Sequence, residues 1–294
     1  MNRVFEYLAG IGMCTEDALV EEWPRVRNAE QVKVYKCKKS GVIFLDTILS
    51  AGAEEFEGKS GYGFYGQISR DEMERQYHYD NLQRRRKYGP LVKNKNWIDI
   101  GAGSGATLNC LSDIAKSSMA VEPKKGARAN LVGQGYTAYA SIKDAVAECE
   151  GAVDVVSLIQ TLPYIDEPIE ELERTRNLLT PGGRIFIEVP HANDALLSFY
   201  NLDAFRDFTY HSELLILHTR QSLKKTLEVA GFEGVVVEGV QRYPLSNHLY
   251  WLANGRPGGH EEWTVMDSQE LESSYAERLK AMNMTDTLVA YARA

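Results

Sequence analysis

Short apolar runs rich in β-branched residues alternate with amphipathic segments between residues 95 and 240. Strands buried on both faces of a sheet show such near-continuous apolarity, and amphipathic segments between them are typical of crossover helices. The alternation therefore predicts an α/β fold with a doubly wound, mainly parallel sheet and helices on both faces. The expected strands are Trp97–Ile100, Met119–Val121, Val153–Ile159, Arg184–Val189 and Gly234–Val237, and the clearest helices are Glu167–Leu179 and Gln221–Ala230.

The segment before this alternation has a different residue pattern. Val32–Lys36 and Val42–Leu45 are strand-like runs joined by a Lys-Lys-Ser-Gly turn, which predicts a hairpin. A loop of glycine and aromatic residues follows at Gly58–Gly66, where the rings could close a site or pack against the core. A helix is expected from about Asp71 to Tyr88, ending at Gly89-Pro90 because proline cannot continue a helix.

These differences divide the 294 residues into three expected regions. Residues 1–90 form an N-terminal hairpin and helical region, and residues 91–240 form the α/β core. Residues 241–294 break the alternation and end in a mixed helical tail, so we expect a C-terminal cap over the site or a subunit contact, which would make a homodimer.

Charge and composition exclude some classes of binding partner. Lys and Arg number 33 against 41 Asp and Glu, and a net charge of −8 argues against nucleic acid, whose phosphates require cations. The basic run Arg84–Lys87 follows the acidic run Asp71–Glu74, which favours a solvated helix face. No stretch approaches the ~20 apolar residues of a membrane span and no signal segment begins the chain, so we expect no membrane partner and a cytoplasmic location.

The four cysteines, Cys14, Cys37, Cys110 and Cys149, are widely spaced and form no CxxC pair. This spacing fits reduced thiols better than a disulfide framework and shows no metal site.

A glycine loop follows the first core strand and opens a helix. Gly101, Ala102, Gly103 and Gly105 allow the backbone to approach a ligand closely, with unpaired helix N–H groups facing it. With Ala106 in the last position, the loop also satisfies the dinucleotide pattern GxGxx(G/A). A nicotinamide or flavin enzyme therefore stays an alternative at this point.

Two acids accompany the loop. Asp99 lies two residues before the first glycine, where a carboxylate can meet a ligand's ammonium group or orient the loop. Glu122 ends the second strand, 21 residues after Gly101, and an acid there can accept both ribose hydroxyls of an adenosine.

Together these motifs resemble the class I S-adenosylmethionine-dependent methyltransferases. Four segments occur in that family's order and approximate spacing across residues 95–240: Asp99–Gly105, Val121–Pro123, Asp154–Leu158 and Leu179–Arg184. The resemblance implies a Rossmann-like core, S-adenosylmethionine as cofactor and S-adenosylhomocysteine as product, without a metal. It places the glycine loop on the methionine part of the cofactor, and Glu122 and neighbouring Pro123 at the ribose. Ser141 or Ile142 would lie near the adenine, and Gln160 and Thr161 beside cofactor and acceptor.

A finer resemblance is to sugar C-methyltransferases and related glycan enzymes. Tyr35–Leu45 is similar to their N-terminal zinc module, whose pattern is CxxCG, but Ser40 replaces the second cysteine. Structural zinc requires four thiolate or imidazole ligands, so we expect the hairpin to persist as packing without zinc. Glu188–His191 and Tyr210-His211 also match this group, whereas Pro163-Tyr164 stands where its members often carry Glu-His.

Methyl transfer to a hydroxyl requires alignment of the acceptor and removal of its proton. Histidine titrates near neutrality and is the usual general base. We rank His211 first, His191 second and His248 third, with Tyr164 as a supporting donor, although a histidine bonded to backbone or water is the competing interpretation for each.

The sequence thus predicts a methyltransferase that acts on a small polar acceptor, most specifically a sugar or nucleotide-sugar hydroxyl in surface-glycan or secondary-metabolite synthesis. Three alternatives stay open: a C- or N-methyltransferase, a non-catalytic cofactor-binding scaffold, and a nicotinamide-dependent oxidoreductase. The oxidoreductase is disfavoured because about 95 residues precede the glycine loop and because it leaves Pro181-Gly182-Gly183 unexplained.

Overall fold

The computed structural model describes residues 2–49 and 78–294, and its larger part is built on a seven-stranded sheet. The strand order is β10-β11-β8-β7-β4-β5-β6. The five strands from β8 to β6 are mutually parallel, and β11 is antiparallel to both of its neighbours. The sheet confirms the expected Rossmann-like architecture. Its strands are Asn96–Ile100 (β4), Ser117–Val121 (β5), Thr137–Tyr139 (β6), Val153–Ile159 (β7), Leu179–Pro190 (β8), Glu233–Val240 (β10) and Thr287–Arg293 (β11).

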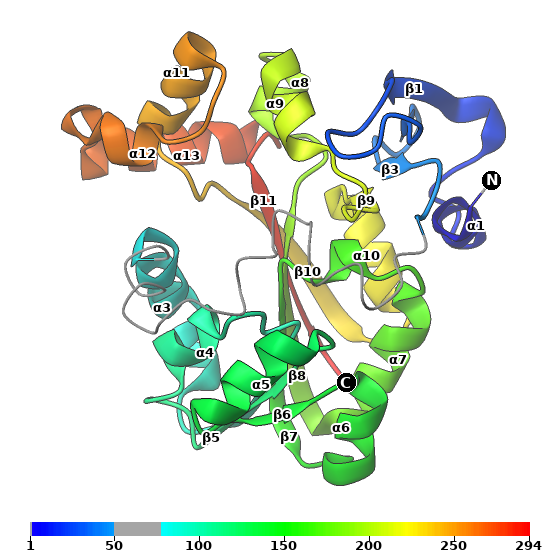
Figure 1. The fold of residues 1–294 in the computed structure, drawn as a ribbon, viewed down its shortest axis with the longest axis vertical. Coiled ribbons are helices and arrows are strands. Elements are labelled where there is room, and N and C mark those ends of the chain that lie inside the picture. The colour runs from blue at the N-terminus through cyan, green and yellow to red at the C-terminus, as the bar shows by residue number, and fades with distance from the viewer. Residues whose placement is uncertain (1, 50–77) are drawn as a thin grey trace.

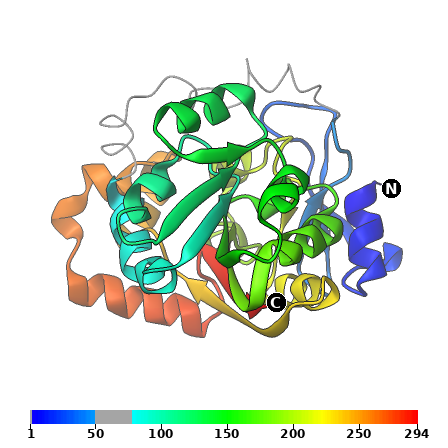
Figure 2. The same ribbon diagram turned by 90° about the horizontal axis from the view of Figure 1, so that it is seen from below.

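Helices cover both faces of this sheet (Figures 1 and 2). On one face Tyr88, Leu108 and Leu131 pack on Trp97 and Phe186, and they come from helices α3, α4 and α5. Leu172 and Leu223, from helices α7 and α10, belong to the apolar cluster on the other face, together with α6. The helices on the two faces are His78–Val92 (α3), Ala106–Leu111 (α4), Lys125–Gly133 (α5), Ile142–Cys149 (α6), Pro168–Leu178 (α7) and Arg220–Val229 (α10).

A second, four-stranded antiparallel sheet lies beyond the carboxyl ends of the parallel strands, in the order β1-β2-β3-β9 (Figure 1). The predicted hairpin is confirmed, because β2 and β3 pair antiparallel from Val34 opposite Leu45. The fourth strand comes from the segment after β8, so the N-terminal region and the core share this sheet. The elements here are Arg3–Gly10 (α1), Glu16–Ala18 (η1), Leu19–Trp23 (β1), Val34–Cys37 (β2), Ile43–Leu45 (β3) and Ile216–Leu217 (β9).

Short helices complete the same end of the molecule. They are Leu162–Tyr164 (η4), Ala195–Ser198 (α8), Asp203–Thr209 (α9), Leu245–Asn254 (α11), Gly259–Glu262 (α12), Thr264–Met266 (η5) and Gln269–Ala281 (α13). In Figure 1, α8, α9 and the group α11–α13 lie above the carboxyl ends of the parallel strands. Among the described residues, no helix combines the length and apolarity needed to span a bilayer.

The C-terminal region differs from the expected cap in one respect. Helices α11–α13 have the predicted mixed helical character, but β11 inserts between β8 and β10 in the central sheet. Leu288, Val289 and Ala290 are fully buried there, which explains why this apolar run completes the sheet. The core therefore includes residues from the expected cap.

The helix before the core also ends later than predicted. Helix α3 continues through Pro90 to Val92, because Tyr88 and Val92 are fully buried against the sheet and Pro90 removes only one hydrogen bond near the helix end. The glycine and aromatic loop at Gly58–Gly66 and the expected helix start near Asp71 lie outside the described residues.

Candidate functional site

The glycine loop lies between β4 and α4, and its conformation requires glycine. Gly101, Gly103 and Gly105 have φ values of 75°, 55° and 88°, in the left-handed region. A Cβ on Gly101 would stand 2.2 Å from Thr161 Oγ1, and one on Gly105 would stand 2.7 Å from Leu131 Cδ2. A Cβ on Gly103 would meet no atom of the described residues within 4 Å. Within residues 2–49 and 78–294, the middle of the loop is therefore uncovered, while its ends pack too closely for a side chain.

Glu122 connects the end of β5 to this loop. The carboxylate is buried, and its Oε2 accepts the Gly103 N–H at 2.8 Å while Oε1 accepts the Lys124 N–H at 2.9 Å. A carboxylate offers about four acceptor positions, so two remain for hydroxyl groups. Pro123 beside it is exposed, and its contact with a ribose stays a prediction.

Asp99 is buried near the carboxyl end of β4, an interior strand of the sheet. Ser157 Oγ donates to Asp99 Oδ1 at 2.6 Å, and Ser157 in turn accepts from Trp97 Nε1 at 2.8 Å. Burial raises the pKa of Asp99 to about 7, although the Ser157 hydrogen bond and the Arg84 charge act in the opposite direction. Asp99 thus titrates near neutrality.

Gln160 and Thr161 follow β7 and lie opposite the glycine loop. Gln160 has a φ of 55°, a left-handed conformation that costs a non-glycine residue roughly 1–2 kcal/mol. Its N–H donates to Glu188 O at 2.7 Å and its Nε2 donates to Glu188 Oε1 at 3.2 Å. The close approach of Thr161 to Gly101 brings two of the predicted cofactor segments together.

Ser141 has a structural partner of its own. It is the N-cap of α6, where its hydroxyl accepts the Asp144 N–H at 3.1 Å. Its contact with an adenine stays a prediction.

Tyr164 and His211, two of the four predicted catalytic residues, are in contact. Their rings stack with centroids 6.0 Å apart, and the backbone of Leu215 donates to Pro163 O at 3.0 Å, which joins the two segments. Burial, together with the nearby charge of Arg27, lowers the pKa of His211 to about 4. This histidine is therefore neutral at pH 7.

His191 and His248 lie apart from this pair. The Nδ1 of His191 is 2.9 Å from the carbonyl oxygen of Thr285, so Nδ1 carries the proton and Nε2 has no partner among the described residues. His248 Nδ1 lies 2.7 Å from the hydroxyl of Tyr275 in the cap. Burial lowers the pKa of both imidazoles to about 4. The structure thus distributes the three candidate bases over separate environments.

The sequence analysis missed a buried ion cluster at the carboxyl ends of the parallel strands. Glu188 at the end of β8 accepts from Arg84 Nη2 at 3.1 Å and Tyr88 OH at 2.6 Å, and Arg242 Nη1 lies 3.9 Å away. The interpretation of the basic run as a solvated face is wrong for Arg84, which is 9% exposed and faces inward. The spacing of Arg84, Tyr88 and Val92 along one helix face is the signal that indicates this orientation.

The two cysteines in and near the segment that resembles a zinc module, Tyr35–Leu45, are part of an apolar cluster. Cys14 and Cys37 are buried under the small sheet with Phe44 and Leu8. Within residues 2–49 and 78–294, no three His, Cys, Asp or Glu side chains gather as metal ligands would.

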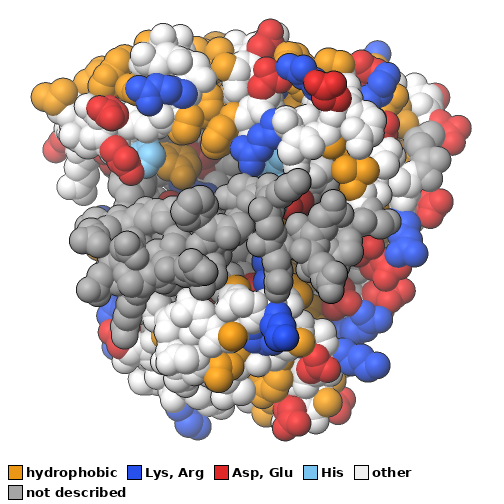
Figure 3. Space-filling model, in the orientation of Figure 1, with side chains coloured by type: hydrophobic (Ala, Val, Ile, Leu, Met, Phe, Trp, Pro, Cys, Tyr) orange, Lys and Arg blue, Asp and Glu red, His pale blue; other side chains and the backbone are white. Residues whose placement is uncertain are grey.

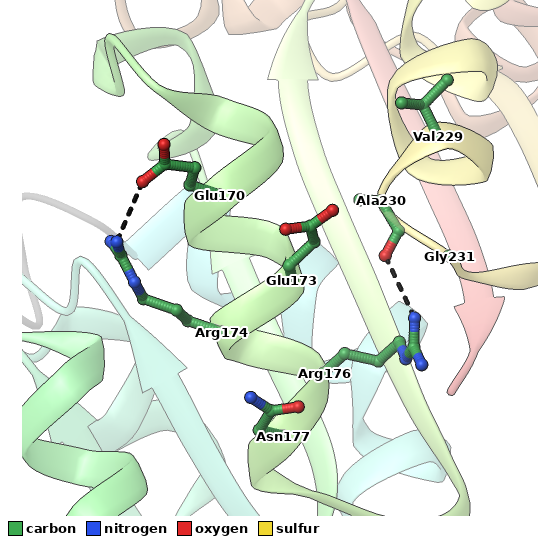
Figure 4. A pocket seen from close by; sticks show the side chains of 8 residues that line it. All are labelled: Glu170, Glu173, Arg174, Arg176, Asn177, Val229, Ala230 and Gly231. Carbon is green, nitrogen blue, oxygen red and sulfur yellow. Dashed lines mark hydrogen bonds and ion pairs between the residues drawn. The ribbon is translucent and has the colours of Figure 1, made fainter.

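A cavity of about 590 Å³ lies elsewhere, between α7 and the end of α10 (Figure 4). Arg174 pairs with Glu170 on α7, and Arg176 Nη1 donates to Ala230 O, so its lining is engaged in helix-surface contacts. Charged side chains of both signs gather over α7 on the right of Figure 3. None of the predicted site residues lines this cavity.

Comparison with known proteins decides the family. A family model described as a methyltransferase domain matches residues 72–237, more than half of the chain. The chain belongs to this family of S-adenosylmethionine-dependent methyltransferase domains. Membership accounts for the glycine loop, the acid after β5 and the Pro-Gly-Gly segment together, and it decides against the nicotinamide alternative.

Individual relatives of this methyltransferase domain are distant. The ubiquinone biosynthesis O-methyltransferase of Vibrio parahaemolyticus is 26% identical over 106 residues, which are 34% of this chain and 45% of that protein. The match therefore spans less than half of the relative.

Solved structures share the fold. The complex of the Haloferax volcanii Trm112 methyltransferase activator with a methyltransferase contains a chain that is 16% identical, with a TM-score of 0.53 over 80% of this chain and 98% of that one. An S-adenosylmethionine-dependent methyltransferase from Archaeoglobus fulgidus is 20% identical, with a TM-score of 0.51 over 75% and 97% of the two chains.

Proposed function

We propose that the protein transfers a methyl group from S-adenosylmethionine to a hydroxyl of a small polar acceptor, a sugar or nucleotide-sugar. Family membership supports the reaction class, and the relative from Vibrio parahaemolyticus, an O-methyltransferase, supports a hydroxyl acceptor. The sugar class rests on the resemblance of Glu188–His191 and Tyr210-His211 to sugar-modifying enzymes.

The residues at the carboxyl edge fit the cofactor. No described residue fills the space at Gly103, Glu122 retains acceptor positions for ribose hydroxyls, and Asp99 can meet an ammonium group. Gln160 and Thr161 border the same space. When bound, S-adenosylmethionine supplies a methyl group activated by its sulfonium centre. The chain's own task is to hold that group and the acceptor in line.

We assign proton removal to His211, with Tyr164 as its support. The observation that carries this assignment is the stacking of the two rings beside the Gln160–Thr161 segment. Burial keeps the imidazole neutral at pH 7, which is the protonation state that a general base needs before it accepts the proton of a hydroxyl. His191 and His248 are the second and third candidates for the same role.

The test is turnover of S-adenosylmethionine with a panel of sugars and nucleotide-sugars, followed as S-adenosylhomocysteine formation and a methylated product. We expect His211→Asn to lower kcat by about 10²–10⁴ without a change in cofactor affinity. His191→Asn and His248→Asn test the other two candidates. A loss of this size in either one, with His211→Asn unchanged, assigns proton removal to that residue instead. A product methylated on carbon or nitrogen contradicts the hydroxyl assignment, and cofactor binding without any turnover supports a scaffold instead.

A homodimer and a cytoplasmic location are further parts of this proposal. Light scattering of the purified chain tests the first, and fractionation of the producing cell tests the second. A monomer at micromolar concentration contradicts the dimer.

A further inference from the structure

Glu188 lies where three segments of the chain meet. Arg84 and Tyr88 reach it from α3, Gln160 reaches it from the end of β7, and Arg242 approaches it from the residues after β10. Burial alone would raise the pKa of Glu188, but the charges of Arg84 and Arg242 and the hydrogen bonds of Tyr88 and Gln160 hold it at about 2. The carboxylate is therefore ionised and fully engaged at neutral pH.

The contact with Gln160 differs from the others because Glu188 holds that residue twice. The backbone carbonyl of Glu188 accepts the Gln160 N–H, and the side-chain carboxylate accepts Gln160 Nε2. Gln160 is in the left-handed region, where a side-chain-bearing residue persists only if its surroundings fix it. The two bonds from Glu188 provide that constraint.

The constraint extends to the glycine loop through the next residue. Thr161 lies so close to Gly101 that no side chain fits between them. A shift of the Gln160 turn therefore moves Thr161 against, or away from, the loop that would hold the cofactor. Catalytic geometry is sensitive to such shifts, since a displacement of about 1 Å can cost 10²-fold in rate.

We propose that Glu188 is a positioning residue for the cofactor site, whose carboxylate fixes the Gln160–Thr161 turn against the glycine loop. The inference deepens the proposed function and rests on it for the identity of the ligand. The effect of Glu188 on the conformation of the Gln160–Thr161 turn does not depend on any ligand.

A second carboxylate makes a matched control. Glu238 on β10 also accepts from a cation and a phenol, Lys87 of the same helix α3 and Tyr291 of β11. Within the described part of the chain, its hydrogen bonds go to Lys87 and Tyr291 and not to the Gln160 turn or the glycine loop. Glu238 is more exposed than Glu188, with 35% against 4% of its side chain exposed, so the comparison rests on where the effect falls. If Glu188 served only to hold α3 on the sheet, neutralising it would leave residues 159–162 no more affected than neutralising Glu238 does.

The experiment compares Glu188→Gln with Glu238→Gln, using amide hydrogen exchange on the ligand-free full chain and calorimetric binding of S-adenosylhomocysteine. We expect Glu188→Gln to speed exchange at residues 159–162 and to weaken binding about tenfold, the size of one charge-assisted hydrogen bond. Glu238→Gln should change neither, although both should lower the unfolding temperature. Equal behaviour of the two variants contradicts the proposal.

A double-mutant cycle with Gln160→Ala separates positioning from general weakening. If Glu188 acts through Gln160, the double variant binds S-adenosylhomocysteine no more weakly than the weaker single variant, whereas independent additive losses contradict the proposal. Absence of binding by the wild-type chain overturns the proposed function alone. The exchange comparison at residues 159–162 then still decides the role of Glu188.

Discussion

The phenol ring of Tyr164 stacks on the imidazole of His211, with 6.0 Å between the ring centroids. The two residues come from different parts of the chain: Tyr164 ends the short helix after β7, and His211 follows α9 in the insertion after β8. Their contact therefore depends on how the insertion folds back over the carboxyl edge of the sheet. Burial of the imidazole in this contact keeps it in its neutral form near pH 7.

The first prediction concerns this stacking. Tyr164→Ala exposes the His211 ring to water, so the pKa of His211 should rise from about 4 toward its ordinary value of 6.5. Nuclear magnetic resonance of the labelled imidazole measures the shift directly. Tyr164→Phe is the control, because it retains the ring and should leave the pKa near 4. An unchanged pKa in Tyr164→Ala would show that other groups bury His211.

The second prediction compares two glycines of the loop. Gly101→Ala adds a Cβ that overlaps Thr161 in addition to the left-handed strain, whereas Gly103→Ala adds only the strain of roughly 1–2 kcal/mol. Urea unfolding should show a clearly larger loss for Gly101→Ala. Thr161→Ala in the Gly101→Ala background removes the nearest atoms and should recover part of it. Equal losses for the two glycine variants would contradict the packing of Thr161 on the loop.

The third prediction concerns the pH dependence of stability. Burial lowers the pKa of His218 to about 3, and within the described chain its ring has one hydrogen-bond partner, Ser222 Oγ at 3.1 Å from Nδ1. A depressed histidine pKa means that the unfolded chain binds the proton first, so stability present above pH 6.5 falls as the pH drops toward 3. The same sign applies to His191, His211 and His248.

Asp99 and Asp194 act in the opposite sense. Burial raises their pKa values to about 7 and about 8, so they contribute stability at low pH that is lost between pH 4 and 8. The variant His218→Gln removes the contribution of one histidine to the pH dependence of the unfolding free energy. Its unfolding free energy should fall less steeply than that of the wild type between pH 6.5 and 4. If the curves of unfolding free energy against pH are parallel for the two proteins, His218 does not take up the proton on unfolding.

The fourth prediction concerns Asp99 and the cofactor. Ser157, Arg84, Glu122 and Glu188 are the groups that act on this carboxyl, and burial outweighs the two that favour its ionised form. If the carboxylate meets the cofactor's ammonium group, affinity for S-adenosylhomocysteine should fall as the pH drops through 7. Asp99→Asn should bind more weakly and without this pH step. A step that persists in the variant assigns the titration to another group.

Much of the core was predictable because its signals are local. The parallel strands have continuous apolar runs, and the glycine loop and Glu122 follow their strands directly in the sequence, so spacing alone placed them at one edge. Strand β11 was missed because its neighbours in the sheet, β8 and β10, lie far from it in the chain.

The ion cluster around Glu188 depends on long-range contacts of the same kind. Arg84 lies 104 residues from Glu188, and its basic neighbours on the helix suggested a solvated face. Arg85, one residue later, does pair with Asp113 at the surface, so only the direction of each side chain separates the two roles. That direction follows from which face of α3 packs on the sheet, and this is a tertiary property.

The most direct test of the account is calorimetric titration of the purified, ligand-stripped chain with S-adenosylmethionine, S-adenosylhomocysteine and NAD in parallel, repeated with Glu122→Ala. That substitution removes the acceptor for the Gly103 and Lys124 N–H groups together with the expected ribose contact. We predict binding of the two sulfur compounds, no binding of NAD, and a loss of roughly tenfold or more in the variant. Binding of NAD alone, or of none of the three, would contradict the account.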